Sequence, residues 1–295
     1  MTPPPPAPRF QYEGAALLAA VSWALAGVWI QWLPGVSLLG VVSGRLALAL
    51  PAVGLVAALG RGSLRELRTA PPWGLGALMV AYYAVAVSAF RLAPVAEVTL
   101  LLNASPLFVA LASPLLRLPL RRAEAAGVVL ALAGVALVLV PGLTAEAADP
   151  GRWGGDALAL AAAALMALYS VLYARAGRGR EAPDARAVTL AALGIGAAGA
   201  VFWATTPEPA TLLASPPRLG ALVGLALVST AIPTLAYSLA SRELPPVTAT
   251  SIRLLTPVFG ALFAVVLLDE PTTPWLWSGG AVVLLGLAII VRPST

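Results

Sequence analysis

The chain has 295 residues, of which 60% are apolar and 11% are charged, and it contains neither cysteine nor histidine. A soluble domain of this length would not tolerate such a composition, so we predict an integral membrane protein. The missing thiols and imidazoles exclude a disulfide framework, a thiolate enzyme and a histidine metal site. The net charge of +5 comes from arginines beside the membrane and does not indicate a nucleic-acid partner.

Ten stretches are long and apolar enough to cross a bilayer, for which a helix needs about 20 residues. We predict spans at 13–33, 37–59, 73–91, 95–117, 122–141, 154–175, 186–205, 217–241, 246–268 and 274–292. Residues 1–12, rich in proline, are expected to form a disordered cytoplasmic tail, and 142–153 an extracytoplasmic linker. Thirteen arginines then lie on the side of the N-terminus and three, Arg91, Arg152 and Arg218, on the other side. The positive-inside rule therefore predicts that both termini are cytoplasmic.

An internal repeat organises these spans, because residues 91–142 recur at 242–293. The pairs at one constant spacing include Arg91 with Arg242, Pro94 with Pro245 and Pro106 with Pro257. Each half, 13–141 and 154–295, would hold five spans, and an odd number makes the second half enter from the opposite side. The predicted fold is an all-α integral membrane protein with ten transmembrane helices in two inverted five-helix repeats. Such repeats are typical of transporters that work by alternating access.

Two arginines lie deep inside predicted spans, Arg45 in the second and Arg253 in the ninth. A central arginine costs about 2.5–3.5 kcal/mol on insertion scales, so both are expected to face a cavity or a gate. Glu97, near the outer end of the fourth span, is the carboxylate expected to pair with them or to carry a proton. The alternatives are that Glu97 complements a helix N-terminus beside Arg91, and that the Arg45 side chain extends outward to the membrane surface.

Pro106 and Pro257 occupy equivalent positions of the two halves and interrupt their spans. Paired interruptions point to a transporter site, so we expect hinges or gates there, with simple kinks as the alternative. Glu270, at the outer end of the ninth span, is expected to cap the tenth.

Aromatic and polar side chains near the middle of the spans form a candidate substrate lining. A buried tyrosine hydroxyl or indole N–H needs a partner, which a ligand or water could provide. For small hydroxyl residues, packing between helices is the alternative. The candidate substrate-binding residues, besides Arg45 and Arg253, are Trp23, Tyr82, Tyr83, Asn103, Tyr169 and Ser251. No metal site, cofactor or catalytic group is expected.

The run from Pro245 to Pro257, followed by Leu267–Pro271, resembles the signature of the EamA-type drug/metabolite transporters. The first copy, Ala93–Phe108, is similar but looser, and the acidic residue usual after the fourth span is absent. Within the family, the chain most resembles the YddG-type exporters of aromatic and other neutral amino acids. The resemblance implies a central cavity lined by spans 1, 3, 4, 6, 8 and 9.

The predicted function is therefore export of amino acids across the bacterial inner membrane by alternating access. In this hypothesis the aromatic side chains stack on the substrate ring, Arg45 or Arg253 meets its carboxylate, and Asn103 meets its ammonium. The alternatives are an EamA-type exporter of another metabolite or drug, and a membrane binding protein without transport. An enzyme is disfavoured because nucleophiles and metal ligands are missing. Oligomeric state, and proton coupling against facilitated diffusion, stay open.

Overall fold

A computed structural model describes residues 10–58, 66–112, 122–143, 150–176, 184–244 and 252–290. Within these ranges every regular element is helical. In chain order the elements are α1 (Phe10–Ala24), α2 (Ala26–Gln31), α3 (Leu38–Ala58), α5 (Ala70–Leu92), α6 (Val95–Leu102), α7 (Ser105–Ala112), α8 (Arg122–Leu143), α9 (Pro150–Ala176), α10 (Ala185–Trp203), α11 (Glu208–Leu213), α12 (Pro216–Ala226), the π-helical turn η2 (Leu227–Ala231), α13 (Ile232–Glu243), α15 (Thr256–Leu268) and α16 (Pro274–Ile290).

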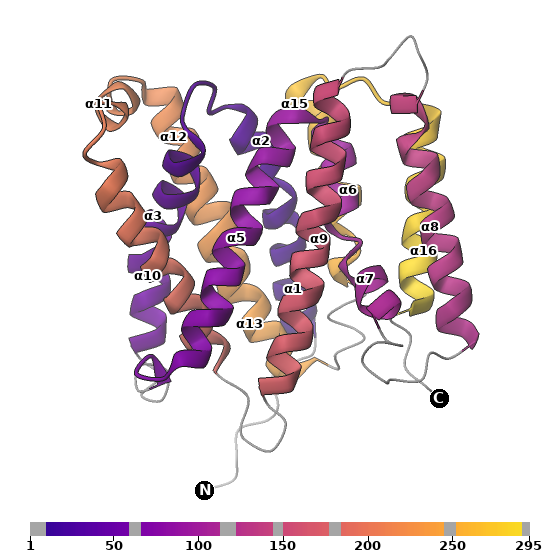
Figure 1. Ribbon diagram of the computed structural model, residues 1–295. Helices are drawn as coiled ribbons and strands as arrows, with labels where there is room; N and C mark the ends of the chain where they lie inside the picture. The colour runs from indigo at the N-terminus through magenta and orange to yellow at the C-terminus, as the bar shows by residue number, and fades with distance from the viewer. Residues whose placement is uncertain are drawn as a thin grey trace, which may run out of the picture.

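The long helices stand side by side in one bundle (Figure 1). Among the described residues, 7 helical segments are long and apolar enough to cross a membrane: Phe10–Gln31, Leu38–Ala57, Ala70–Leu92, Val95–Ala112, Gly151–Tyr173, Arg186–Trp203 and Pro216–Ala240. Shorter apolar helices cover Ala125–Val140, Thr256–Leu268 and Pro274–Ile290. The count of ten crossings and the inverted relation of the halves stay predictions.

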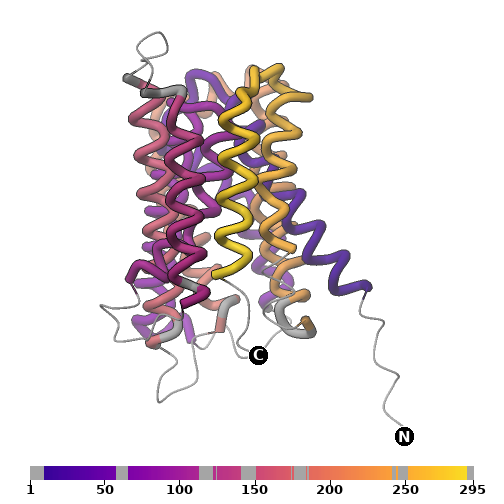
Figure 2. The backbone as a smooth tube through the Cα atoms, turned by 90° about the vertical axis from the view of Figure 1, so that its right-hand side faces the viewer, coloured from indigo at the N-terminus to yellow at the C-terminus, as the bar shows by residue number. Residues whose placement is uncertain are grey.

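The outer surface of the bundle is apolar, as a lipid-facing surface must be. Leu55, Val129, Val201 and Phe202 are 69, 67, 72 and 66% exposed. A soluble protein would bury side chains of this size. The first turn of α1 and the last turn of α16 lie at the same end of the bundle (Figure 2). We call this the N-terminal end and the other the opposite end.

Four of the apolar segments are interrupted near their middle. α1 and α2 are separated at Leu25, α6 and α7 at Asn103–Ala104, and η2 divides α12 from α13. A turn at residues 254–255 precedes α15. Pro106 and Pro257 are each the second residue of the helix that follows a break. A backbone N–H at this position has no intrahelical acceptor, so its absence in proline costs no hydrogen bond. The breaks before α7 and α15 thus fall at matching places in the internal repeat.

Helices α8 and α16 form a close pair at one edge of the bundle (Figure 1). An added Cβ at Gly134 would lie 2.5 Å from the Val283 nitrogen, and one at Gly286 would lie 2.5 Å from the Ala131 nitrogen. Only glycine allows the two backbones to approach this far. Gly134 and Gly286 therefore have a packing role at the periphery of the bundle.

Several predicted boundaries are wrong. The helix α1 begins at Phe10, so residues 10–12 are not part of a disordered tail, and α9 begins at Pro150 inside the predicted linker. The residues between the seventh and eighth predicted spans contain α11. The eighth span is not a continuous α-helix, because η2 interrupts it. Hydropathy alone marks none of these features.

Candidate functional site

Arg45 lies near the middle of α3, buried inside the bundle with 4% of the residue exposed. Its Nε and Nη2 donate to the Thr230 hydroxyl at 3.0 and 2.9 Å, and Nη2 also donates to the Ser229 carbonyl at 3.3 Å. Both acceptors belong to η2, and such π-helical turns are frequent at functional sites. Every one of these contacts is to a neutral oxygen. In the part of the chain that the structure describes, no carboxylate contacts Arg45.

Two tyrosines of α5 lie against this guanidinium. The Arg45 Cζ atom is 4.5 Å from the centroid of the Tyr83 ring, a cation–π distance. The Tyr82 and Tyr83 rings are 5.5 Å apart and tilted by 58°. Arg253 interacts electrostatically with Tyr82. We call Arg45, Tyr82, Tyr83, Thr230 and Arg253 the central cluster.

The other predicted aromatic residues lie on neighbouring helices. Tyr169 of α9 stacks on Tyr173 at 5.9 Å and interacts electrostatically with Tyr83, so it lies beside the central cluster. Trp23 of α1 packs on Tyr237 of α13, with ring centroids 5.2 Å apart. Tyr237 was missed in the sequence because it lies near the end of the eighth predicted span, where a tyrosine is expected at the membrane interface. The contact across α1 and α13 could be found only from the fold.

The remaining predicted substrate residues have local roles or lie outside the described ranges. Asn103 stands at the break between α6 and α7, and its Nδ2 donates to the Thr99 carbonyl at 2.8 Å. This bond ties the Asn103 side chain to the last turn of α6. Ser251 lies outside the described residues.

Glu97 pairs with Arg152 at the opposite end of the bundle. Arg152 donates from Nε to one Glu97 oxygen at 3.1 Å and from Nη2 to the other, which makes a bidentate ion pair. Glu97 is 3% exposed. The expectation that Glu97 pairs with Arg45 or Arg253 is therefore wrong, because those arginines lie deeper in the bundle. Arg152 was missed as a partner because it was placed in a linker.

Two further carboxylates surround this pair. Glu270 accepts the backbone N–H groups of Val95 at 2.8 Å and Ala96 at 3.2 Å, so it caps α6 and not the last helix as predicted. The left-handed backbone of Asp269, with φ of 53°, ends α15 and turns the chain at this point. Asp156 is 3% exposed, and its Oδ1 has no hydrogen-bond partner among the described residues. We call Glu97, Arg152, Asp156 and Glu270 the end network.

A second set of polar contacts at the same end joins α11 to the start of α3. Glu208 accepts from the Ser37 backbone N–H, from the Ser37 hydroxyl at 2.6 Å and from Trp203 Nε1 at 2.7 Å. Arg91 Nη2 donates to the Val36 carbonyl at 2.5 Å. Burial raises the pKa of Glu208, but the hydrogen bonds from Ser37 and Trp203 outweigh this, and the pKa is lowered.

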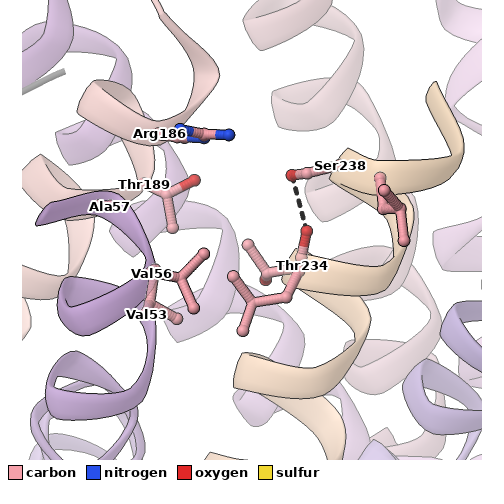
Figure 3. Close-up of a pocket in the computed structure, with 9 residues that line it drawn as sticks. Val53, Val56, Ala57, Arg186, Thr189, Thr234 and Ser238 are labelled. Atoms are coloured by element: carbon pink, nitrogen blue, oxygen red, sulfur yellow. Dashed lines mark hydrogen bonds between the residues drawn. The ribbon is translucent and has the colours of Figure 1, made fainter. Parts of the chain in front are cut away.

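A cavity of about 240 Å³ opens between α3, α10 and α13, towards the N-terminal end. Val53, Val56 and Ala57 form its apolar side, and Arg186 and Ser238 point towards each other across it (Figure 3). Thr234 lies one helical turn from Thr230 on the same segment, and its hydroxyl donates to the Thr230 carbonyl at 2.6 Å. The cavity therefore adjoins the segment that holds Arg45.

A comparison with protein families assigns the chain. The model of the EamA-like transporter family matches it twice, over residues 12–140 and 153–292. The chain belongs to the EamA-like transporter family. As an EamA-like protein it is a multi-pass membrane transporter of small molecules, and members of this family are not enzymes. A search of curated proteins found no match.

The fold also matches solved structures. One crystal structure aligns with 96% of this chain and 96% of its own, with a TM-score of 0.65 and 24% sequence identity. Identity at this level supports the shared fold of the EamA-like chain and carries no information about its substrate.

Proposed function

We propose that this EamA-like protein exports amino acids, aromatic and other neutral ones, across the bacterial inner membrane by alternating access. In this proposal ten helices form two inverted repeats, 13–141 and 154–295, and both termini are cytoplasmic. The substrate site is the central cluster, together with Trp23, Asn103, Tyr169 and Ser251. No cofactor takes part.

The observation that carries the proposal is the buried Arg45. Burying a charge without a counter-charge is unfavourable, and neutral acceptors replace only part of the lost hydration. A substrate carboxylate would supply the missing charge-assisted hydrogen bonds. Tyr82 and Tyr83 provide flat apolar faces beside this carboxylate, which suits an aromatic ring.

The breaks at Pro106 and Pro257 support a moving site. Interrupted helices leave backbone groups free near the middle of the bundle and allow each half-helix to tilt separately. In the proposal α7 and α15 act as hinges, and the end network closes the path at the opposite end. Opening that end would separate Glu97 from Arg152 and withdraw Glu270 from the first turn of α6.

Glu97 is proposed as the proton site. A carboxylate that loses its cationic partner during opening would bind a proton at that step, which would couple transport to a proton gradient. In proteoliposomes Glu97→Gln should then abolish any effect of a pH gradient on export while transport down a concentration gradient continues. A gradient effect of unchanged size in Glu97→Gln would remove Glu97 from this role.

Transport by the purified full chain tests the proposal. Proteoliposomes loaded with labelled phenylalanine or tryptophan should release the label faster than empty liposomes, with saturation as the internal concentration rises. Arg175→Gln, an exposed position on α9, is the matched control and should keep the native rate. Release no faster than from empty liposomes, across a panel of amino acids, would overturn the proposal of amino acid export.

A further inference from the structure

The charges in the middle of the described bundle have one sign. Arg45 is buried, and Arg253 lies near enough to Tyr82 to act on it. The acidic side chains that the structure describes lie in loops, at helix caps or within the first two turns of helices; they are Glu13, Glu66, Glu97, Asp156, Asp184, Glu208, Asp269 and Glu270. Arg45 therefore lies against Tyr83, Arg253 is near Tyr82, and no carboxylate in the described ranges contacts Arg45.

The start of α15 adds positive potential close to Arg253. This helix of 13 residues begins at Thr256, directly after the break that follows Arg253. The first N–H groups of a helix have no intrahelical acceptor and carry a partial positive charge. Thr256 is 4% exposed, and its hydroxyl oxygen has no hydrogen-bond partner among the described residues. An oxygen of a ligand would satisfy this buried donor.

The cavity at the N-terminal end repeats the pattern. Its charged lining residue is Arg186, and its polar ones are Thr189, Thr234 and Ser238 (Figure 3). Thr234 and Thr230 are joined by the bond from the Thr234 hydroxyl, and Thr230 accepts from Arg45. A ligand that moved from this cavity to the central cluster would thus meet Arg186 first, then hydroxyl groups of α13 and η2, and finally Arg45.

We infer that the central cluster selects its substrate as an organic anion, and that aromatic 2-hydroxy and 2-oxo acids are carried in preference to the amino acids with the same ring. This inference rests on the proposed transport through that cluster. A carboxylate meets Arg45, Arg253 and the start of α15, and the ring meets Tyr82 and Tyr83. An ammonium group would meet like charges and lose its hydration without a carboxylate to replace it. Amino acids are therefore transported, but their ammonium group weakens their binding to the central cluster.

Three compounds with one phenyl ring separate carboxylate from ammonium recognition: phenyllactate, phenylalanine and phenethylamine. Each competes, unlabelled, against labelled phenylalanine taken up by proteoliposomes that contain the full chain. Phenyllactate should reach half inhibition at a concentration at least about tenfold below that of phenylalanine, and phenethylamine should not compete. In Glu97→Gln, which removes the proposed proton site, directly measured phenyllactate flux should respond to an imposed membrane potential because the anion carries net charge, whereas phenylalanine flux should not.

Substitutions connect this preference to the residues. Thr230→Asp supplies the missing carboxylate beside Arg45, so it should remove the advantage of phenyllactate while the buried guanidinium stays paired and the chain stays folded. Arg253→Gln should reduce the advantage, and Arg175→Gln, outside the cluster, should leave it unchanged. Folding of each variant is checked by its elution and thermal unfolding in detergent.

The outcomes separate this inference from the proposed function. Phenylalanine transport with weaker competition by phenyllactate than by phenylalanine would overturn the inference and leave amino acid export standing. Competition by phenethylamine as strong as that by phenyllactate would also overturn it. Absence of flux for all three compounds would overturn both proposals.

Discussion

The buried charges of the central cluster and of the end network differ in their partners. At the end network, Arg152 holds Glu97 by both oxygens, and Glu270 caps a neighbouring helix from the other half of the chain. At the central cluster, Arg45 contacts a hydroxyl group, a carbonyl group and an aromatic ring, but no carboxylate among the described residues. Charges that hold the fold together are paired within the chain, and the charge at the candidate substrate site is not.

This difference distinguishes a structural ion pair from a site that awaits a ligand. Breaking the first should lower stability. Changing the second should alter binding more than stability, because neutral acceptors already hold the guanidinium. The following substitutions test each side of the comparison.

The largest expected effect is at Arg152. Arg152→Met would leave Glu97 buried without its partner, beside Asp156, and should lower the free energy of unfolding by about 3–5 kcal/mol. Thermal unfolding in detergent measures this loss. The double variant Arg152→Met with Glu97→Gln removes the unpaired charge and should recover more than half of the lost stability. A double variant no more stable than Arg152→Met would contradict an ion pair at this place.

A smaller effect is expected at Tyr83, on the other side of the comparison. Tyr83→Leu removes the ring over Arg45 and should weaken phenylalanine binding by about 1–2 kcal/mol, from loss of the cation–π contact and of a surface for the substrate ring. Tyr83→Phe keeps the ring and should bind nearly as the native chain does. Equal loss in both variants would assign the effect to the hydroxyl group. Competition against labelled phenylalanine in detergent provides the measurement.

The residues of the two regions were not equally visible in the sequence. Arg45, Tyr82 and Tyr83 could be chosen as candidates from the sequence because each lies deep inside an apolar span, where a charge or a tyrosine has few explanations. The breaks before α7 and α15 could be predicted because Pro106 and Pro257 repeat. Each of these signals is local, and hydropathy and repetition are enough to detect it.

The end network could not be predicted in the same way. Its contacts join Glu97 to Arg152 and Glu270 to the first turn of α6, across segments that are far apart in the chain. Helix-terminal acids look alike in sequence, because each fits the N-terminus of its own helix equally well. Only the arrangement of the helices decides which terminus an acid reaches, and this is why Glu270 was assigned to the wrong one.

The smallest expected effect is the pH dependence of Glu208. Its folded-state pKa lies below the ordinary value of 4.5, so its stabilising contribution is fully present above that pH and is lost as the pH falls through the lower value. Solvent screens this partly exposed group, and the contribution should stay below about 1 kcal/mol. Native protein should lose slightly more stability between pH 7 and pH 4 than Glu208→Gln. Identical pH profiles would show that the contacts with Ser37 and Trp203 add nothing measurable.

The most direct measurement compares the binding of phenylalanine with that of phenylalaninamide, which lacks the carboxylate, to the native chain and to Arg45→Met. If Arg45 holds the substrate carboxylate, the native chain binds phenylalanine more tightly by at least about tenfold, and Arg45→Met binds both compounds with similar, weak affinity. A folded Arg45→Met protein that keeps the native preference for phenylalanine would contradict this role of the buried arginine.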